Sequence, residues 1–198
     1  MFRMFIQTLI SQKVLVKNKF ISLPGTVEAG ANGSGFFISN NKFRRILGID
    51  PGLASTGYGI IDFFENRYRL VSYGVISTNS KELHGQRLLE IYTQLLSIIQ
   101  KFQPKEASME TLYFSKNVTS AMSVAEAKGV ITLCLTQNCI SVKEYSPNII
   151  KQSVTGTASA DKKAVQEYIR LLLGLKTIPK PDHAADALAA AITHIHSN

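Results

Sequence analysis

A strand–turn–strand stretch over residues 44–59, RRILGIDPGLASTGYG, constrains the fold of this chain more than any other part. The apolar run before Asp50 predicts a short strand, Pro51 and Gly52 turn the chain, and residues 56–61 return as a second strand. A carboxylate at the end of a buried strand lowers stability unless a cation or hydrogen-bond donors satisfy it. Asp50 therefore either belongs to a charged site or only caps the Pro-Gly turn, where Asp is common.

The rest of the chain predicts three consecutive strands followed by alternating helices and strands. An apolar stripe at helical spacing favours the helix over residues 82–102. Three consecutive strands followed by this alternation are typical of an α/β protein, with a mixed five-stranded sheet flanked by helices. Strands are predicted at 44–50, 56–64, 67–77, 105–110 and 140–145. Helices are predicted at 82–102, 117–138, 148–154 and 182–196, and another runs to 173 from a cap at Ser159 or Asp161.

The N-terminal 43 residues differ in composition from the rest. They contain five of the basic residues but one acid, and they carry half of the net charge of +8. Because half of the charge lies in this segment, the net charge is only weak evidence for a polyanionic partner of the rest of the chain. We predict an N-terminal extension over 1–43, either disordered, mis-assigned as the start, or a transit peptide, followed by one domain of ordinary size over 44–198.

The remaining composition narrows the class of protein. No apolar run is long enough to span a bilayer, so no membrane association is predicted. Cys134 and Cys139 are too few for a disulfide framework and show no metal-binding spacing. We interpret them as buried thiols of a cytoplasmic protein.

Two predicted strands end in a carboxylate. Glu110 ends the fourth strand as Asp50 ends the first, so the two would lie at one edge of the sheet if the strands are neighbours. The alternative is that Glu110 is an ordinary solvated acid at the start of a loop.

The last predicted helix supplies further polar side chains. His183 and Asp186 are three residues apart and share one helical face. The small apolar residues that follow predict close packing on the sheet, which would hold both side chains beside the strand ends. Asp182 is assigned to capping the helix N-terminus, and His194 and His196 are expected at the surface.

Asp50, Glu110, Asp186 and His183 together provide three hard oxygen ligands and one imidazole. Such a set favours Mg²⁺ or Mn²⁺ over zinc. Two such ions can activate water and stabilise the leaving oxygen in phosphodiester hydrolysis.

Several separated motifs resemble those of the RuvC family of Holliday-junction resolvases in order and spacing. They are ILGIDPG with TGYG, SME with YFSKN, EYSPNIIKQSVTG, and DHAADALAAAITH, and they extend over residues 44–196. The resemblance implies a ribonuclease H-like fold, a homodimer, and an endonuclease of DNA recombination and repair. It also implies metal-dependent cuts in two opposed strands of a four-way junction, with the RuvA–RuvB branch-migration complex as partner.

The resemblance also implies residue roles. Asp50, Glu110 and Asp186 match catalytic metal ligands, and His183 takes the place of a fourth carboxylate, although the neighbouring Asp182 stays an alternative. Two Mg²⁺ ions per subunit are implied, with Mn²⁺ able to substitute. We expect the imidazole to make Mn²⁺ comparatively more effective.

A further set of residues matches the family's DNA contacts. Tyr113 and Phe114 lie in the loop where the family places an aromatic ring that stacks on an unpaired base. Lys151 and Lys162 match lysines that contact phosphates near the scissile bond, and Lys116 extends this basic track.

Three other functions stay open at this point. A ribonuclease H-like nuclease could act on another nucleic acid, which a panel of junction, fork and RNA–DNA hybrid would reveal. The strand–turn–strand stretch also resembles the phosphate hairpin of actin-like nucleotide-binding proteins, which would bind ATP. A junction-binding protein that does not cut would not need such a concentration of acids beside DNA.

Overall fold

The computed structural model describes residues 43–111 and 118–197. This part of the chain contains a five-stranded sheet in the order β3-β2-β1-β4-β5. Neighbours among β1, β2 and β3 are antiparallel, whereas β4 is parallel to both β1 and β5. The predicted mixed five-stranded sheet is therefore confirmed. The strands are β1 (Arg44–Asp50), β2 (Ser55–Phe64), β3 (Arg67–Ser77), β4 (Glu106–Glu110) and β5 (Ser141–Tyr145).

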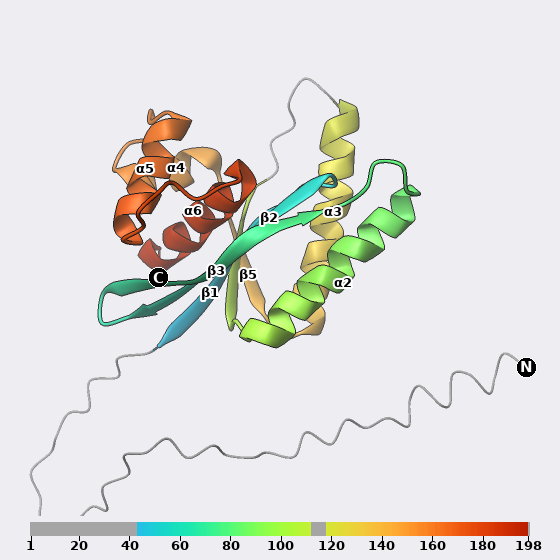
Figure 1. Cartoon of the computed structure of the whole chain (residues 1–198), viewed down its shortest axis with the longest axis horizontal. Helices are drawn as coiled ribbons and strands as arrows, with labels where there is room; N and C mark the ends of the chain where they lie inside the picture. The colour runs from blue at the N-terminus through green and yellow to red at the C-terminus, as the bar shows by residue number, and fades with distance from the viewer. Residues whose placement is uncertain (1–42, 112–117, 198) are drawn as a thin grey trace, which may run out of the picture. The chain divides into compact units, whose positions relative to one another are not determined.

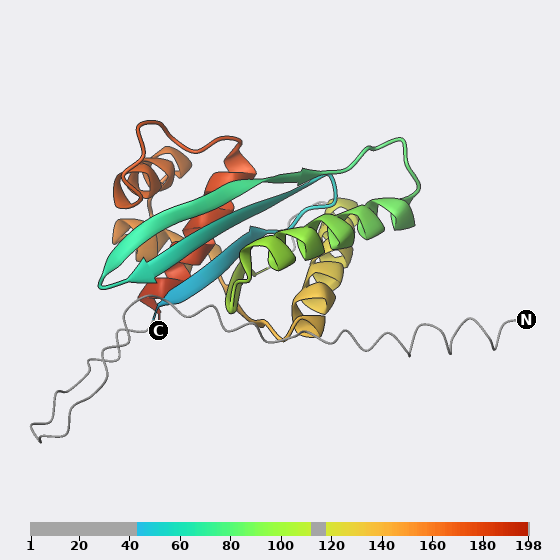
Figure 2. The same ribbon diagram turned by 60° about the horizontal axis from the view of Figure 1, so that its bottom comes forward.

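Helices cover both faces of the sheet (Figures 1 and 2). The helices α2 (His84–Phe102) and α3 (Val118–Gln137) lie on one face, and α4 (Pro147–Thr155), α5 (Lys162–Leu172) and α6 (Asp182–His196) lie on the other. Within the described residues, no helix combines the length and the apolar character needed to cross a bilayer.

The first face shows how well hydrophobic spacing predicted packing. Ile91, Leu95 and Ile99 of α2 are buried against the sheet, as their helical spacing predicts.

The prediction of two buried thiols is right for Cys134 and wrong for Cys139. Cys139 follows the end of α3 in a turn, where its backbone has a φ of 56° and its side chain is exposed.

On the second face, α6 packs unusually close to the sheet because glycines face it. A Cβ added to Gly57 would lie 1.9 Å from the carbonyl oxygen of His183, and one added to Gly48 would lie 1.9 Å from that of Ala187. Small residues fill the helix side of the contact, including the buried Ala184 and Ala191. This packing fixes the first turn of α6 beside the end of β1.

The C-terminal turn of α6 corrects one prediction. His194 is only 4% exposed, although a position near the chain end predicted a surface residue. Its Nδ1 lies 2.8 Å from the Tyr145 hydroxyl and its Nε2 lies 3.0 Å from Glu106 Oε2. The helix stays packed on the sheet through Ile195, so His194 is covered, whereas His196 is exposed as predicted.

Candidate active site

Asp50 and Glu110 lie at the same edge of the sheet because β1 and β4 are parallel neighbours. Ile49 pairs with Met109, and the two carboxylates are the next residues of their strands. The parallel pairing brings together two acids that are 60 residues apart in the sequence, as the strand pattern predicts.

The first two turns of α6 add two more polar side chains to this edge. His183 Nδ1 donates a hydrogen bond of 2.7 Å to Asp50 Oδ2. Asp186 lies one turn further along the helix, and its charge acts on both strand-end carboxylates. We refer to Asp50, Glu110 and Asp186 together as the carboxylate cluster.

Burial and mutual repulsion both disfavour ionisation in the carboxylate cluster. Burial raises the pKa of Asp50, and the charge of Asp186 raises it further against the opposing effect of His183. Burial also raises the pKa of Glu110, followed by the charges of Asp50 and Asp186. Negative charge is therefore held here at a free-energy cost that a cation would relieve.

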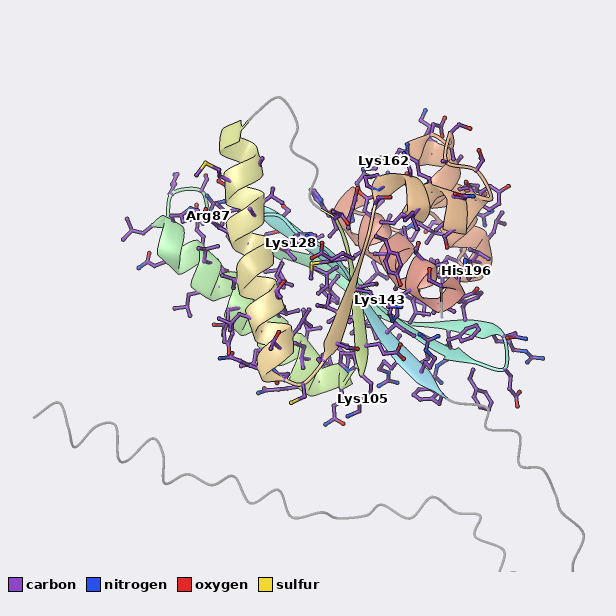
Figure 3. All side chains as sticks on the ribbon, turned by 180° about the vertical axis from the view of Figure 1, so that it is seen from behind. Arg87, Lys105, Lys128, Lys143, Lys162 and His196 are labelled. Carbon is purple, nitrogen blue, oxygen red and sulfur yellow. The ribbon has the colours of Figure 1, made fainter. Side chains whose placement is uncertain are left out.

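Lys162, the first residue of α5, reaches across to α6. Its Nζ lies 3.1 Å from Asp186 Oδ2 and 3.1 Å from Asp182 Oδ2. Burial opposes its charge, but the hydrogen bonds to Asp182 and Asp186 outweigh this effect and raise the pKa of Lys162. Figure 3 shows Lys162 on the α4–α6 side of the sheet, whereas Lys128 lies on α3.

The structure corrects the role assigned to Asp182. Pro181 occupies the N-cap position, and Asp182 is already the first residue of α6 without a side-chain cap hydrogen bond. Its carboxylate faces α5 instead, where it accepts from Gln166 Nε2 at 3.1 Å and pairs with Lys162. His183 contacts Asp50, whereas the carboxylate of Asp182 faces α5. The geometry therefore favours His183 over Asp182 as the residue beside the carboxylate cluster.

The donor set fits a hard divalent cation. Carboxylate oxygens dominate it, and such ligands suit Mg²⁺ and Mn²⁺. Among residues 43–111 and 118–197, however, no three His, Cys, Asp or Glu side chains are already arranged around one ion position. Asp50 is instead paired with His183, and Asp186 with Lys162.

A cavity of 170 Å³ opens beside the carboxylate cluster. Its charged lining residues come from β4, α4, α5 and α6, and its other lining residues are apolar. Lys151, on α4, joins Lys162 at this cavity, so both predicted phosphate contacts lie next to Glu110 and Asp186. The lining residues are Glu110, Pro147, Ile150, Lys151, Lys162, Val165, Asp186 and Ala189.

Some predicted residues were not placed, and some contacts were not predicted. Tyr113, Phe114 and Lys116 lie outside the described residues. The sequence pattern predicted neither the Lys162 contact with α6 nor the position of Gly57 beneath His183. Glycines spaced two residues apart in β2, Gly57 and Gly59, were the available signal for the close approach.

The mixed sheet, with carboxylates at the ends of β1 and β4 and on a helix packed across them, defines the class of ribonuclease H-like nucleases. Within this class, the family model described as crossover junction endodeoxyribonuclease RuvC matches residues 46–194. The chain therefore belongs to the RuvC family. This membership confirms the predicted class of enzyme, a DNA endonuclease, and implies dependence on a divalent metal ion.

Similar proteins agree with this assignment. The RuvC of Treponema denticola is 60% identical over 151 residues, which cover 76% of this chain and 85% of that protein. The RuvC of Treponema pallidum is 52% identical over 158 residues, covering 80% and 81%. The structure of Thermus thermophilus RuvC in complex with a Holliday junction substrate is similar with a TM-score of 0.75 and 31% identity, covering 78% of this chain and 94% of that one.

Proposed function

We propose that this chain resolves four-way DNA junctions by hydrolysing one phosphodiester bond in each of two opposed strands. The observation that carries the proposal is the carboxylate cluster beside two lysines, Lys151 and Lys162, at one cavity. Carboxylates bind metal ions and lysines bind phosphates, so the two kinds of side chain together can bind a scissile phosphate beside a metal ion. The similar Thermus thermophilus protein is described with a Holliday junction substrate, which supports the choice of DNA structure.

We assign Asp50, Glu110, Asp186 and His183 as the residues that hold two Mg²⁺ ions in each subunit, with Mn²⁺ as a substitute. When bound, these ions supply an activated water and stabilise the leaving oxygen. His183 orients Asp50 through the 2.7 Å hydrogen bond, which restricts the carboxylate to one direction. A site that includes an imidazole also favours Mn²⁺ more than a site built of carboxylates alone would.

Binding of the junction is assigned to a basic and an aromatic group. Lys151 and Lys162, which line the cavity, contact phosphates of the junction. Lys116 extends this basic track. Tyr113 and Phe114 stack on an unpaired base at the crossover, a contact of about 1–3 kcal/mol per base.

We further propose that the chain acts as a homodimer. Two opposed cuts require two sites, and large apolar side chains on α2 and α3 lie exposed, namely Leu89, Met122 and Leu133. The RuvA–RuvB branch-migration complex is the expected partner by family membership. Light scattering of the purified chain tests the dimer.

The decisive experiment incubates the purified chain with an end-labelled synthetic four-way junction, with and without Mg²⁺. Paired nicks that require Mg²⁺ are expected from the wild-type chain and are absent from Asp50→Asn. A fork and an RNA–DNA hybrid serve as competing substrates, and preferential cutting of either would replace the junction as the substrate. Binding of ATP without cutting would instead favour the actin-like alternative.

A further inference from the structure

Lys162 holds a position that its role in phosphate binding does not explain. Its ammonium group lies 3.1 Å from carboxylate oxygens of both Asp182 and Asp186, which stand one turn apart on α6. An ammonium group has three N–H donors. Two of them therefore point at α6, so Lys162 is bound to the protein's own acids in the structure.

The charge of Lys162 extends beyond these two contacts. It acts on Asp50 and on Glu110 as well, so it is a shared counter-ion of the whole carboxylate cluster. Lys151 acts on Glu110 among these groups. Lys162 therefore resembles a bound cation more than Lys151, the other lysine of the cavity, does.

A divalent cation ligated by Asp186 would compete with this ammonium group. Both cations need the same carboxylate oxygens, and their like charges repel at short range. The side chain of Lys162 is 53% exposed and flexible, so it can turn away into solvent or toward a phosphate. Asp186 is paired with Lys162 in the structure, and among the described residues no three potential ligands are grouped around one ion position.

We propose that Lys162 is an internal counter-ion that competes with the divalent metal in the DNA-free protein and so weakens metal binding before substrate arrives. This rests on the proposed function of the carboxylate cluster as the metal site. The ammonium group must leave the Asp186 carboxylate before this carboxylate is free to ligate the metal. Lys162 therefore serves as a counter-ion of these acids in the DNA-free protein as well as a phosphate contact.

The test measures Mn²⁺ binding to the DNA-free protein by electron paramagnetic resonance of the unbound ion. Lys162→Met is expected to tighten Mn²⁺ binding by about fivefold or more, whereas Lys162→Arg, which keeps the charge, stays within about twofold of wild type. Lys163→Met is the matched control, because the neighbouring residue of α5 is exposed and its substitution removes the same charge.

Unchanged Mn²⁺ affinity in Lys162→Met would overturn the proposal, and so would equal tightening in Lys163→Met, which would indicate a general charge effect. Tightening confined to Lys162→Met supports it. The measurement needs no DNA cleavage. If wild-type protein cuts junctions but Lys162→Met leaves Mn²⁺ affinity unchanged, only this inference fails; if wild-type protein does not cut junctions, the proposed function fails independently.

Discussion

The two ends of β1 and β4 carry the same kinds of charged residue but arrange them in opposite ways. Where the strands begin, Arg44 bonds Glu106 through two hydrogen bonds of 2.9 and 2.6 Å, and His194 adds a third contact. Where the strands end, Asp50 and Glu110 meet with Asp186 of α6, and the charges of these acids disfavour one another's ionisation. We call the first group the paired end and keep the name carboxylate cluster for the second.

The pKa values show what this difference means. The hydrogen bonds from Arg44 are the main reason why the pKa of Glu106 falls from 4.5 to about 2. Burial and like charges instead raise the pKa of Asp50 and of Glu110. The paired end thus stabilises the fold at neutral pH, whereas the carboxylate cluster costs stability there. A protein keeps such a cost where function requires it.

The largest expected effect comes from Asp50→Asn. This change keeps the shape of the side chain and removes the charge that the metal needs, so nicking of a four-way junction should fall by at least about a hundredfold to a thousandfold. Binding of the junction should persist, because no phosphate contact is lost. Gel-shift and cleavage assays on the same protein separate the two effects.

The same substitution sharpens the comparison through stability. Since the ionised Asp50 is disfavoured in the folded chain, Asp50→Asn should leave the melting temperature equal to or above that of wild type. A variant that cuts at the normal rate, or one that melts far below wild type, would contradict this account of the carboxylate cluster.

The strand pattern predicted Asp50 and Glu110 as neighbours because the sequence alone shows a carboxylate at the end of each of the two strands. It could not predict that Lys162 would face Asp186, since the connection between α5 and α6 sets that distance. His194 was wrongly placed at the surface for a similar reason. Its burial depends on how far α6 stays packed on the sheet, which is a property of the tertiary structure.

Gly57→Ala is expected to have the next largest effect. Its new Cβ would meet the carbonyl carbon and oxygen of His183, so the first turn of α6 must move away from Asp50. We expect a loss of about 3 kcal/mol in the free energy of unfolding, as for other overpacked positions. Urea denaturation measures this loss.

Nicking by Gly57→Ala should fall at temperatures where the variant is fully folded, because His183 and Asp186 move with the helix. Gly85→Ala is the control, since nothing lies within 4 Å of a Cβ at that position of α2. Full activity in a folded Gly57→Ala variant would show that the close approach does not position the site.

Glu106→Gln tests the paired end. It removes the anion that Arg44 faces and should lower stability by about 2 kcal/mol at pH 7, less than for a fully buried pair because Glu106 is partly exposed to solvent. Nicking by the folded variant should stay at the wild-type level.

The pH dependence of stability should change as well. The pKa of Glu106 is lowered on folding, so its contribution is present above about pH 4.5 and is lost as the pH falls toward about 2. Wild-type stability should therefore decline over this range, and Glu106→Gln should show a shallower decline. Parallel curves for the two proteins would argue against the assigned ion pair.

The smallest expected effect is stabilisation by the metal itself. A cation that binds only the folded chain raises stability by about 1.4 kcal/mol at ten times its dissociation constant. Thermal melts with Mn²⁺ and with the metal removed by chelation should show this rise in wild type and in Glu106→Gln, but not in Asp50→Asn. The two ends of the same strands then respond in opposite ways, because a cation relieves repulsion only at the carboxylate cluster. An equal rise in Asp50→Asn would place the metal elsewhere and remove the reason for gathering these acids at the strand ends.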